Sequence, residues 1–178
     1  MKTIFFAIFL VFGLFFSLAQ EDIKPDEVSP EANSELKVNA LYLVLGAFEV
    51  TYEHILSEES GIGVSVFLPY DSDIKDEIQY YISPYFRYYF GNKYATGFFL
   101  EGFGMLNSTE RSFDIFFEEP EDDFVTDFAL GIGLGGKWVT KKGFVGEISF
   151  GVGRNLFNSD EGLYEFVSKG AITVGYRF

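Results

Sequence analysis

The sequence predicts an all-β fold, an eight-stranded antiparallel up-and-down transmembrane β-barrel. Three observations lead to this prediction. The chain opens with an apolar segment of the kind that directs export, and from residue 36 onward apolar and polar residues alternate in one segment after another. No segment after the opening one is apolar and uninterrupted for the roughly 20 residues of a spanning helix, so a membrane protein of this sequence would cross with strands.

Residues 1–19 are predicted to be a cleaved signal peptide. Lys2 supplies the positive start, and residues 4–16 are almost wholly apolar. Ser17 and Ala19 are small residues at the positions that a signal peptidase reads before a cut after Ala19. An acidic segment follows, rather than the charged flank of a membrane anchor, so this segment is excluded from the fold.

Residues 20–35 are predicted to form an acidic disordered leader on the periplasmic side. They combine Pro25 and Pro30 with six acids and one lysine, and they contain little that folding would bury. The outer-membrane barrel is then predicted to occupy residues 36–178.

Eight strands are predicted within the barrel region. They cover residues 36–45, 47–56, 60–70, 78–90, 93–107, 124–139, 143–154 and 164–178. Short connections alternate with longer ones, which is typical of bacterial barrels with short periplasmic turns and long outer loops. Only the first outer connection, at 45–47, breaks this alternation. An even number of strands puts both termini on the periplasmic side.

Alternate residues of each predicted strand form one apolar and one polar row. In the last strand the row from Tyr164 to Phe178 is apolar or small, and the row from Glu165 to Arg177 holds every charge. The apolar rows are predicted to face lipid. Pro84 lies inside a predicted strand and cannot donate a ladder hydrogen bond, so it predicts a bulge.

The polar rows are predicted to fill the lumen with ion pairs. The bases are Lys37, Arg87, Lys137, Lys169 and Arg177, and the acids are Glu49, Glu53, Glu101, Asp127, Glu147 and Glu165. A narrow lumen requires nearly equal numbers of acids and bases, because unpaired buried charge is costly. Glycines on the same rows leave room for these side chains, and an eight-stranded barrel is filled by its own residues, so no open pore is expected.

The net charge of −14 lies outside the predicted barrel wall. Residues 20–35, 71–77 and 110–123 hold the whole excess of acids, and the remainder is balanced at ten acids and ten bases. A nucleic-acid partner is therefore disfavoured, because binding phosphates needs clustered Lys and Arg. The absence of cysteine excludes disulfides, thiolate metal sites and cysteine enzymes.

Candidate catalytic or metal-binding residues are few. His54 is the only histidine, and it has no evident serine partner at the outer rim, so an interfacial residue is favoured over a general base. Asp71, Asp73 and Lys75 begin like a calcium loop but place Lys where an oxygen ligand belongs. No catalytic residue and no cofactor are predicted.

An acidic run in the longest predicted outer loop is a weak candidate for binding divalent cations, including those that bridge lipopolysaccharide. Its acids are Glu118, Glu119, Glu121, Asp122 and Asp123. A repelling hydrophilic loop is the favoured interpretation.

The chain ends in Ile172-x-Val174-x-Tyr176-x-Phe178, which resembles the carboxy-terminal signature that the barrel-assembly machinery reads in bacterial outer-membrane proteins. The region after residue 36 resembles a small OmpA/OmpX-like barrel. Its first half, from Leu36 to Phe90, is similar to a Bacteroidota outer-membrane barrel family of unassigned function. The resemblance implies a monomer in the cell outer membrane that contacts lipid and lipopolysaccharide, and it supplies no catalytic residues.

The predicted function is therefore non-enzymatic. The favoured hypothesis is a barrel with a filled, ion-paired lumen and acidic outer loops that has a structural or surface-interaction role. The alternative is a soluble lipocalin-like carrier, in which the same rows are inverted and aromatic side chains line a cavity for a small apolar ligand.

Overall fold

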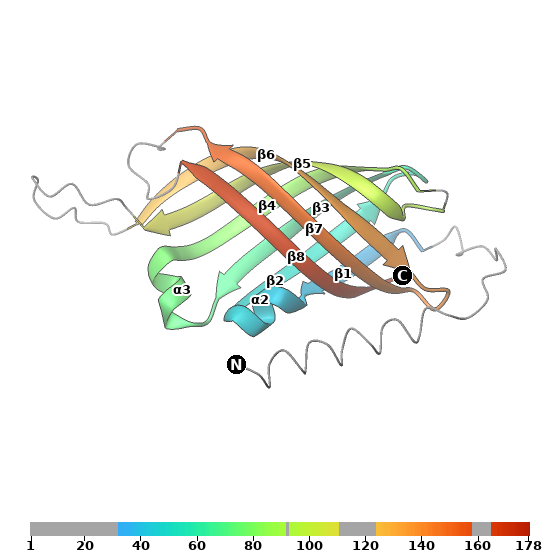
Figure 1. Cartoon of the computed structure of the whole chain (residues 1–178), viewed down its shortest axis with the longest axis horizontal. Helices are drawn as coiled ribbons and strands as arrows, with labels where there is room; N and C mark the ends of the chain where they lie inside the picture. The colour runs from blue at the N-terminus through green and yellow to red at the C-terminus, as the bar shows by residue number, and fades with distance from the viewer. Residues whose placement is uncertain (1–31, 92, 111–123, 158–164) are drawn as a thin grey trace, which may run out of the picture.

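The computed structural model of the chain is a closed barrel in which eight antiparallel strands follow one another in sequence order (Figure 1). The strands are β1 (Ser34–Asn39), β2 (Ala47–Ile55), β3 (Ser60–Pro69), β4 (Ile78–Tyr89), β5 (Gly97–Glu110), β6 (Phe124–Val139), β7 (Phe144–Asn155) and β8 (Phe166–Arg177). The predicted eight-stranded antiparallel up-and-down barrel is confirmed.

The structure describes residues 32–91, 93–110, 124–157 and 165–178. The predicted signal peptide, most of the predicted leader and the acidic run of the longest loop lie outside these ranges.

The first predicted strand is wrong over its second half, because β1 ends at Asn39 and is followed by a helix, α2 (Ala40–Leu45). The Asn39 side chain caps this helix by accepting from the amides of Leu41 and Tyr42. Gly46 closes it in the left-handed conformation with φ 115°. The first outer connection is thus longer than expected, and the alternation of short and long connections is restored.

A second helix, α3 (Ser72–Glu77), lies in the predicted loop between β3 and β4, where Asp71 caps it by accepting from the amide of Asp73. Both helices lie at the same end of the barrel (Figure 1), called here the helix end. The opposite end, where β1 begins and β8 finishes, is called the terminus end.

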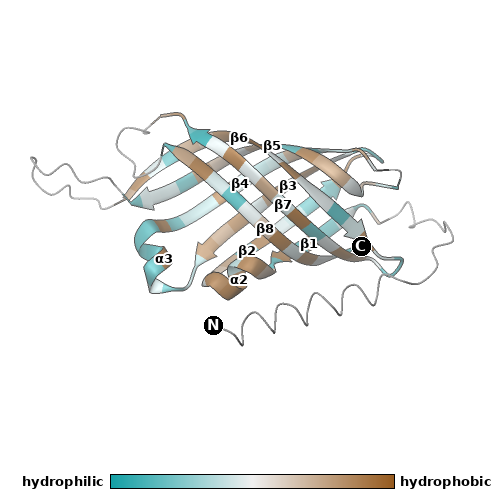
Figure 2. Cartoon of the chain, viewed as in Figure 1, coloured by the Kyte–Doolittle hydropathy of each residue, from teal (hydrophilic) through white to brown (hydrophobic). Residues whose placement is uncertain are grey.

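The apolar rows face outward on every strand. Ile132 is 73% exposed at mid-barrel and Trp138 is 61% exposed near the terminus end. Further outward residues are Leu36, Phe48, Val50, Ile62, Leu68, Ile82, Phe86, Phe98, Leu100, Leu130, Leu134, Phe144, Phe150, Val152, Phe166, Ile172 and Val174. Apolar and polar residues alternate along the ribbons in Figure 2. The barrel wall therefore presents an apolar surface to its surroundings.

The inward rows also carry aromatic residues, and glycines on neighbouring strands make room for them. A Cβ atom at Gly63 would collide with the ring of Tyr85, and one at Gly131 would collide with the ring of Phe103. Gly135 stands in the same relation to Phe99, with 2.5 Å to the nearest ring atom. The glycines of the polar rows therefore accommodate rings as well as charged chains.

The bulge predicted at Pro84 is absent. The β4–β5 register is the same on both sides of Pro84, and its one irregularity lies between Ile78 and Tyr80. This register places Pro84, which has no N–H, opposite Gly104. The Ser83 hydroxyl donates to the Gly104 carbonyl at 2.9 Å instead. A side chain thus compensates for the missing backbone donor.

Two buried clusters, one toward each end, pack the interior. The helix-end cluster consists of Ala47, Phe67, Tyr81, Tyr85, Phe103, Met105 and Ala129, with Tyr42 of α2 and Ile74 of α3 packed against it. The terminus-end cluster consists of Ile55, Tyr89, Ala95 and Phe99.

Residues 93–96, between β4 and β5, pack against the terminus end of the barrel and contribute Ala95 to the cluster there. The Ala95 amide donates to the Glu58 carbonyl at 2.7 Å. The Arg177 guanidinium donates to the carbonyls of Tyr94 and Ala95, each at 3.0 Å. These contacts hold the connection across the end of the lumen.

Candidate functional site: an ion-paired layer in the lumen

Between the two clusters, charged side chains from seven strands meet in one connected network. Its bases are Lys37, Arg87, Lys137, Lys169 and Arg177, and its acids are Glu35, Glu53, Glu101 and Glu147. We call this set the ionic layer. The period of two in each strand directs these residues inward, and the closed wall brings them together.

Glu53 of β2 is the centre of the ionic layer and is fully buried. Five donors reach its carboxylate: Lys37 Nζ at 2.7 Å, Lys137 Nζ at 2.7 Å, Arg87 Nη1 at 2.9 Å, the Tyr85 hydroxyl at 2.9 Å, and the Tyr89 hydroxyl. Because a carboxylate offers about four lone-pair sites, this acceptor is saturated.

Two further carboxylates surround Arg87. Glu147 accepts a two-pronged bond from its Nη1 and Nη2 at 2.7 and 2.9 Å, and also accepts from Lys37 at 2.9 Å. Glu101 accepts from Arg87 Nε at 2.7 Å and pairs with Lys169 at 2.6 Å. The planar guanidinium thus uses its fixed fork of donors on three acids.

Aromatic faces complete the surroundings of the cations. The Arg87 guanidinium lies 4.3 Å from the centre of the Tyr85 ring and 4.2 Å from that of Phe99. Lys137 Nζ lies 4.3 Å from the centre of the Tyr89 ring. Desolvated contacts of this kind contribute about 2 kcal/mol each. They join the ionic layer to the clusters above and below it.

Glu35 is a member of the ionic layer that the sequence analysis missed, because it was assigned to the leader. It accepts from Arg177 Nε and Nη2 at 2.8 and 2.6 Å and from Lys137 at 3.0 Å. The available signal was its position two residues before Lys37 on the same row. The acidic composition of the preceding segment hid this signal.

Glu165 was wrongly predicted to face the lumen. It pairs with Arg154 at 2.7 Å, and the two side chains are 48% and 62% exposed. Because β8 begins at Phe166, Glu165 precedes the strand, and the alternation of the strand does not set its direction.

Two predicted lumen acids are buried but lie outside the ionic layer. Glu49 accepts from the Asn39 side chain at 2.5 Å. Asp127 accepts from the amides of Phe128 and Phe157 at 2.6 and 3.1 Å. Both lie closer to the helix end, where they hold the wall and its connections.

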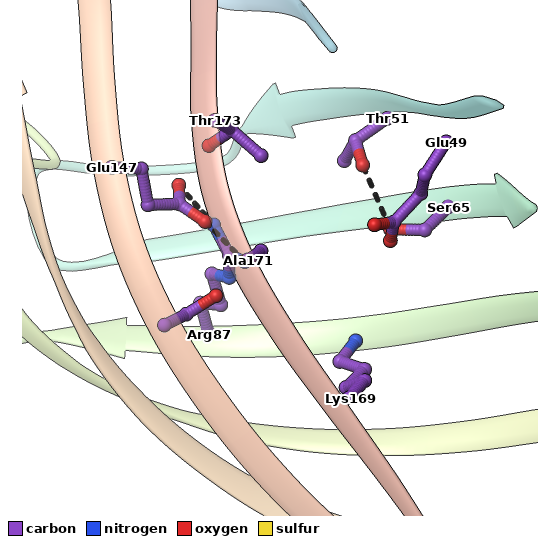
Figure 3. A pocket seen from close by; sticks show the side chains of 9 residues that line it. Glu49, Thr51, Ser65, Arg87, Glu147, Lys169, Ala171 and Thr173 are labelled. Atoms are coloured by element: carbon purple, nitrogen blue, oxygen red, sulfur yellow. Dashed lines mark hydrogen bonds and ion pairs between the residues drawn. The ribbon is translucent and has the colours of Figure 1, made fainter. Parts of the chain in front are cut away.

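A small cavity adjoins the ionic layer on its helix-end side (Figure 3). It is lined by Glu49, Thr51, Ser65, Arg87, Glu147, Ser149, Lys169, Ala171 and Thr173. Its volume is about 10 Å³, which is room for about one water molecule. A carrier of small apolar molecules needs a site of several hundred cubic ångströms, whereas this cavity is far smaller and is lined almost entirely by charged and hydroxyl-bearing residues.

His54 lies near the terminus end, with its Nδ1 3.4 Å from the Ser34 hydroxyl. A nucleophile and its general base are usually separated by about 2.6 to 3.2 Å between heavy atoms, so this distance is longer than a working pair would have. The same hydroxyl also contacts the Tyr52 hydroxyl at 3.1 Å and donates to the Asn33 side chain at 3.3 Å. His54 and Ser34 thus belong to a polar edge where β1 meets β2.

Within the described ranges, no group of three or more His, Asp or Glu side chains is placed to hold a metal ion. The acidic candidates Glu118 to Asp123 lie outside those ranges. No helix in the described part of the chain is long and apolar enough to cross a membrane.

A family described as "protein of unknown function (DUF3575)" matches residues 5–175. The chain belongs to this family. None of the curated proteins compared with this DUF3575 member matches it.

Two solved structures are similar to this DUF3575 protein, and the first of them supports the fold. The N-terminal β-barrel domain of Pseudomonas aeruginosa OprF superposes with a TM-score of 0.56 at 13% identity, over 83% of this chain and 98% of that one. The Yersinia pestis outer-membrane protein Ail, solved in a phospholipid bilayer nanodisc, gives 0.40 at 17% identity, over 83% of this chain and 100% of that one. The likeness to the OprF domain confirms the predicted barrel fold.

Proposed function

We propose that this protein is a non-enzymatic barrel of the outer membrane, with a closed lumen and a structural or surface-interaction role. One observation carries the proposal: the charged rows face inward and pair, while the apolar rows face outward on every strand. A soluble carrier of an apolar ligand requires the opposite arrangement, with charge outside and a cavity inside.

Aromatic residues support the membrane orientation. Toward the terminus end, two pairs of rings lie on the outer surface. The ring centres of Tyr88 and Phe90 are 5.1 Å apart, and those of Phe144 and Tyr176 are 5.6 Å apart. A third pair, Phe48 and Tyr70, lies at the helix end with its ring centres 5.0 Å apart. Such rings favour the two interfaces of a bilayer. The terminus end then faces the periplasm and the helix end faces outward.

The interior supports a closed barrel. A permeating ion would meet the helix-end cluster, the ionic layer and the terminus-end cluster in succession. Phe67 and Phe99, one in each cluster, are 4% and 0% exposed. The proposed role therefore lies in the membrane position and the external loops, and not in transport through the lumen.

The exposed apolar row at the end of β8 supports recognition by the barrel-assembly machinery. Its members Ile172, Val174, Tyr176 and Phe178 are 40 to 57% exposed, so an assembly factor can reach them along the edge of a folding chain. Contact with lipopolysaccharide, and cation binding at Glu118 to Asp123, are part of the same proposal and rest on the acidic sequence.

Detergent extraction and gel mobility test the proposal. A closed membrane barrel should remain insoluble without detergent, migrate faster unboiled than boiled, and give no step conductance in a planar bilayer. A monomer that stays in solution without detergent would exclude the membrane barrel and favour the carrier. Stable conductance steps would exclude the closed lumen but not the membrane barrel.

A further inference from the structure

The wall of the barrel is incomplete as a sheet between β8 and β2. β1 has six residues, whereas a tilted strand needs about 9 to 11 to cross a bilayer. Its pairing with β8 stops at Asn39 opposite Thr173, and its pairing with β2 stops at Val38 opposite Val50. β8 and β2 both continue toward the helix end without a strand between them.

The helix α2 fills this gap, and side chains replace the missing ladder. The Ile172 amide donates to Asn39 Oδ1 at 3.3 Å, and the Gly170 amide donates to the Tyr42 hydroxyl at 3.3 Å. The Asn39 Nδ2 group donates to the Gly170 carbonyl at 3.2 Å. At Gly170 and Ile172 the free edge of β8 is thus satisfied by the N-cap and first turn of the helix, as a wall facing lipid requires of its backbone groups.

The outer face of α2 is apolar and exposed. Leu43, Val44 and Leu45 are 41%, 77% and 56% exposed, and the helix carries no charge. Tyr42 instead points into the barrel, with its ring centre 5.2 Å from that of Phe67. The helix therefore has one side in the core and one side facing out of the wall.

The second helix at this end, α3, allows a direct comparison with α2. α3 has the same length as α2, but its sequence is Ser-Asp-Ile-Lys-Asp-Glu. Figure 2 shows α2 as hydrophobic and α3 as hydrophilic. Equal length and opposite chemistry indicate that the two helices meet different surroundings.

The apolar face of α2 continues the outward surface of the neighbouring strands. The Tyr70 hydroxyl donates to the Leu43 carbonyl at 2.6 Å, and the Tyr70 ring packs on Phe48, which is 52% exposed. No polar border separates Leu45 from Phe48 along the chain, since Gly46 and the buried Ala47 lie between them.

We propose that α2 is a helical panel of the membrane wall, and that the acyl chains of outer-leaflet lipid pack directly on Leu43, Val44 and Leu45. The inference rests on the proposed membrane position, and it adds a lipid contact site that strand pairing alone would not provide. α3 lies outside the hydrocarbon.

Tryptophan fluorescence with brominated lipids tests this directly. Trp138 is the only tryptophan, so the Trp138→Phe protein is a dark background. Val44→Trp is the test variant, Ile132→Trp the mid-barrel reference and Lys75→Trp the matched variant on α3. Each is reconstituted in phosphatidylcholine vesicles with or without bromine on the acyl chains, and folding is checked by heat-shifted gel mobility. Leu45→Trp replaces Val44→Trp if the latter fails to fold.

We expect acyl bromine to quench Val44→Trp as strongly as Ile132→Trp and several-fold more than Lys75→Trp. Quenching of Val44→Trp by aqueous iodide but not by bromolipid, with Ile132→Trp still quenched by bromolipid, would overturn the panel and leave the membrane barrel standing. Loss of bromolipid quenching at Ile132→Trp as well would overturn the membrane barrel itself, and the panel with it.

Discussion

Glu53 accepts from more donors than any other carboxylate of the ionic layer. We therefore expect its negative charge to contribute strongly to the stability of the barrel. Three of its five donors are the cations Lys37, Arg87 and Lys137. Glu53→Gln keeps the volume but leaves these cations short of one negative charge in a buried site. We expect a loss of about 3 to 5 kcal/mol in the free energy of unfolding, measured with urea in lipid vesicles.

Glu165→Gln is the matched control for that experiment. The pair of Glu165 with Arg154 is half exposed, so the same substitution should cost at most about 1 kcal/mol. Equal losses for the two variants would mean that the ionic layer does not stabilise the barrel.

Ile132 tests the direction of the rows. It is 73% exposed in the middle of β6, so Ile132→Arg places a guanidinium at the proposed bilayer midplane. The expected cost is about 2 to 4 kcal/mol, and the yield of folded protein in vesicles should fall accordingly. Ser57→Arg, in the exposed turn between β2 and β3, should fold like the unaltered protein. Normal folding of Ile132→Arg would contradict the lipid-facing assignment.

The sequence predicts most residues of the ionic layer, because alternation within a strand fixes the facing of each residue once one member is known. Glu49 and Asp127 face inward as predicted but lie outside the ionic layer, whereas Glu35 and Glu165, for which the prediction about facing the lumen was wrong, both lie where a strand begins. There the direction of a side chain depends on whether the residue pairs with a neighbouring strand, and pairing is a property of the closed barrel. The specific partners of Arg87 were equally beyond prediction, since they come from strands far apart in the sequence.

Among the elements, α2 is the one that the strand pattern misrepresents. The run from Ala40 to Leu45 is apolar and suits a buried strand as well as a helix, because periodicity is weak in so short a segment. Asn39 and Gly46 decide the matter by capping both ends. Both capping residues can be recognised in the sequence, but the regular succession of predicted strands on either side favours a strand at this position.

Asn39→Ala tests the seam between α2 and β8. It removes the cap of the helix, worth about 1 kcal/mol, and leaves the Ile172 amide and the Gly170 carbonyl without partners, at about 1 to 3 kcal/mol each. Amide hydrogen exchange in nanodiscs should accelerate at Ile172 and Gly170.

Val174 and Tyr176 provide the control within the same strand. They lie opposite Val38 and Leu36 of β1, so their amides should keep their slow exchange in Asn39→Ala. Exchange that increases along the whole of β8 would indicate general unfolding, and unchanged exchange at Ile172 would show that the side chain does not close the seam.

For the whole molecule, the number of strands, the facing of the rows and the near-balance of charge followed from the sequence, because a closed barrel constrains all three together. The layered interior did not. Tyr81, Tyr85, Phe99 and Phe103 lie on the polar rows, and only the closed wall shows that they gather toward the ends and leave the charges between them.

Because the two clusters and the ionic layer lie one after another along the lumen, the loss of one of them should leave the lumen closed by the other two. Phe99→Ala opens the terminus-end cluster and Phe67→Ala opens the helix-end cluster, each at a cost of about 3 to 5 kcal/mol. Neither variant should conduct in a planar bilayer, because the ionic layer and the opposite cluster still block the path. Conductance steps in either single variant would show that one cluster alone seals the barrel, with Ile132→Trp as a control that leaves the interior unchanged.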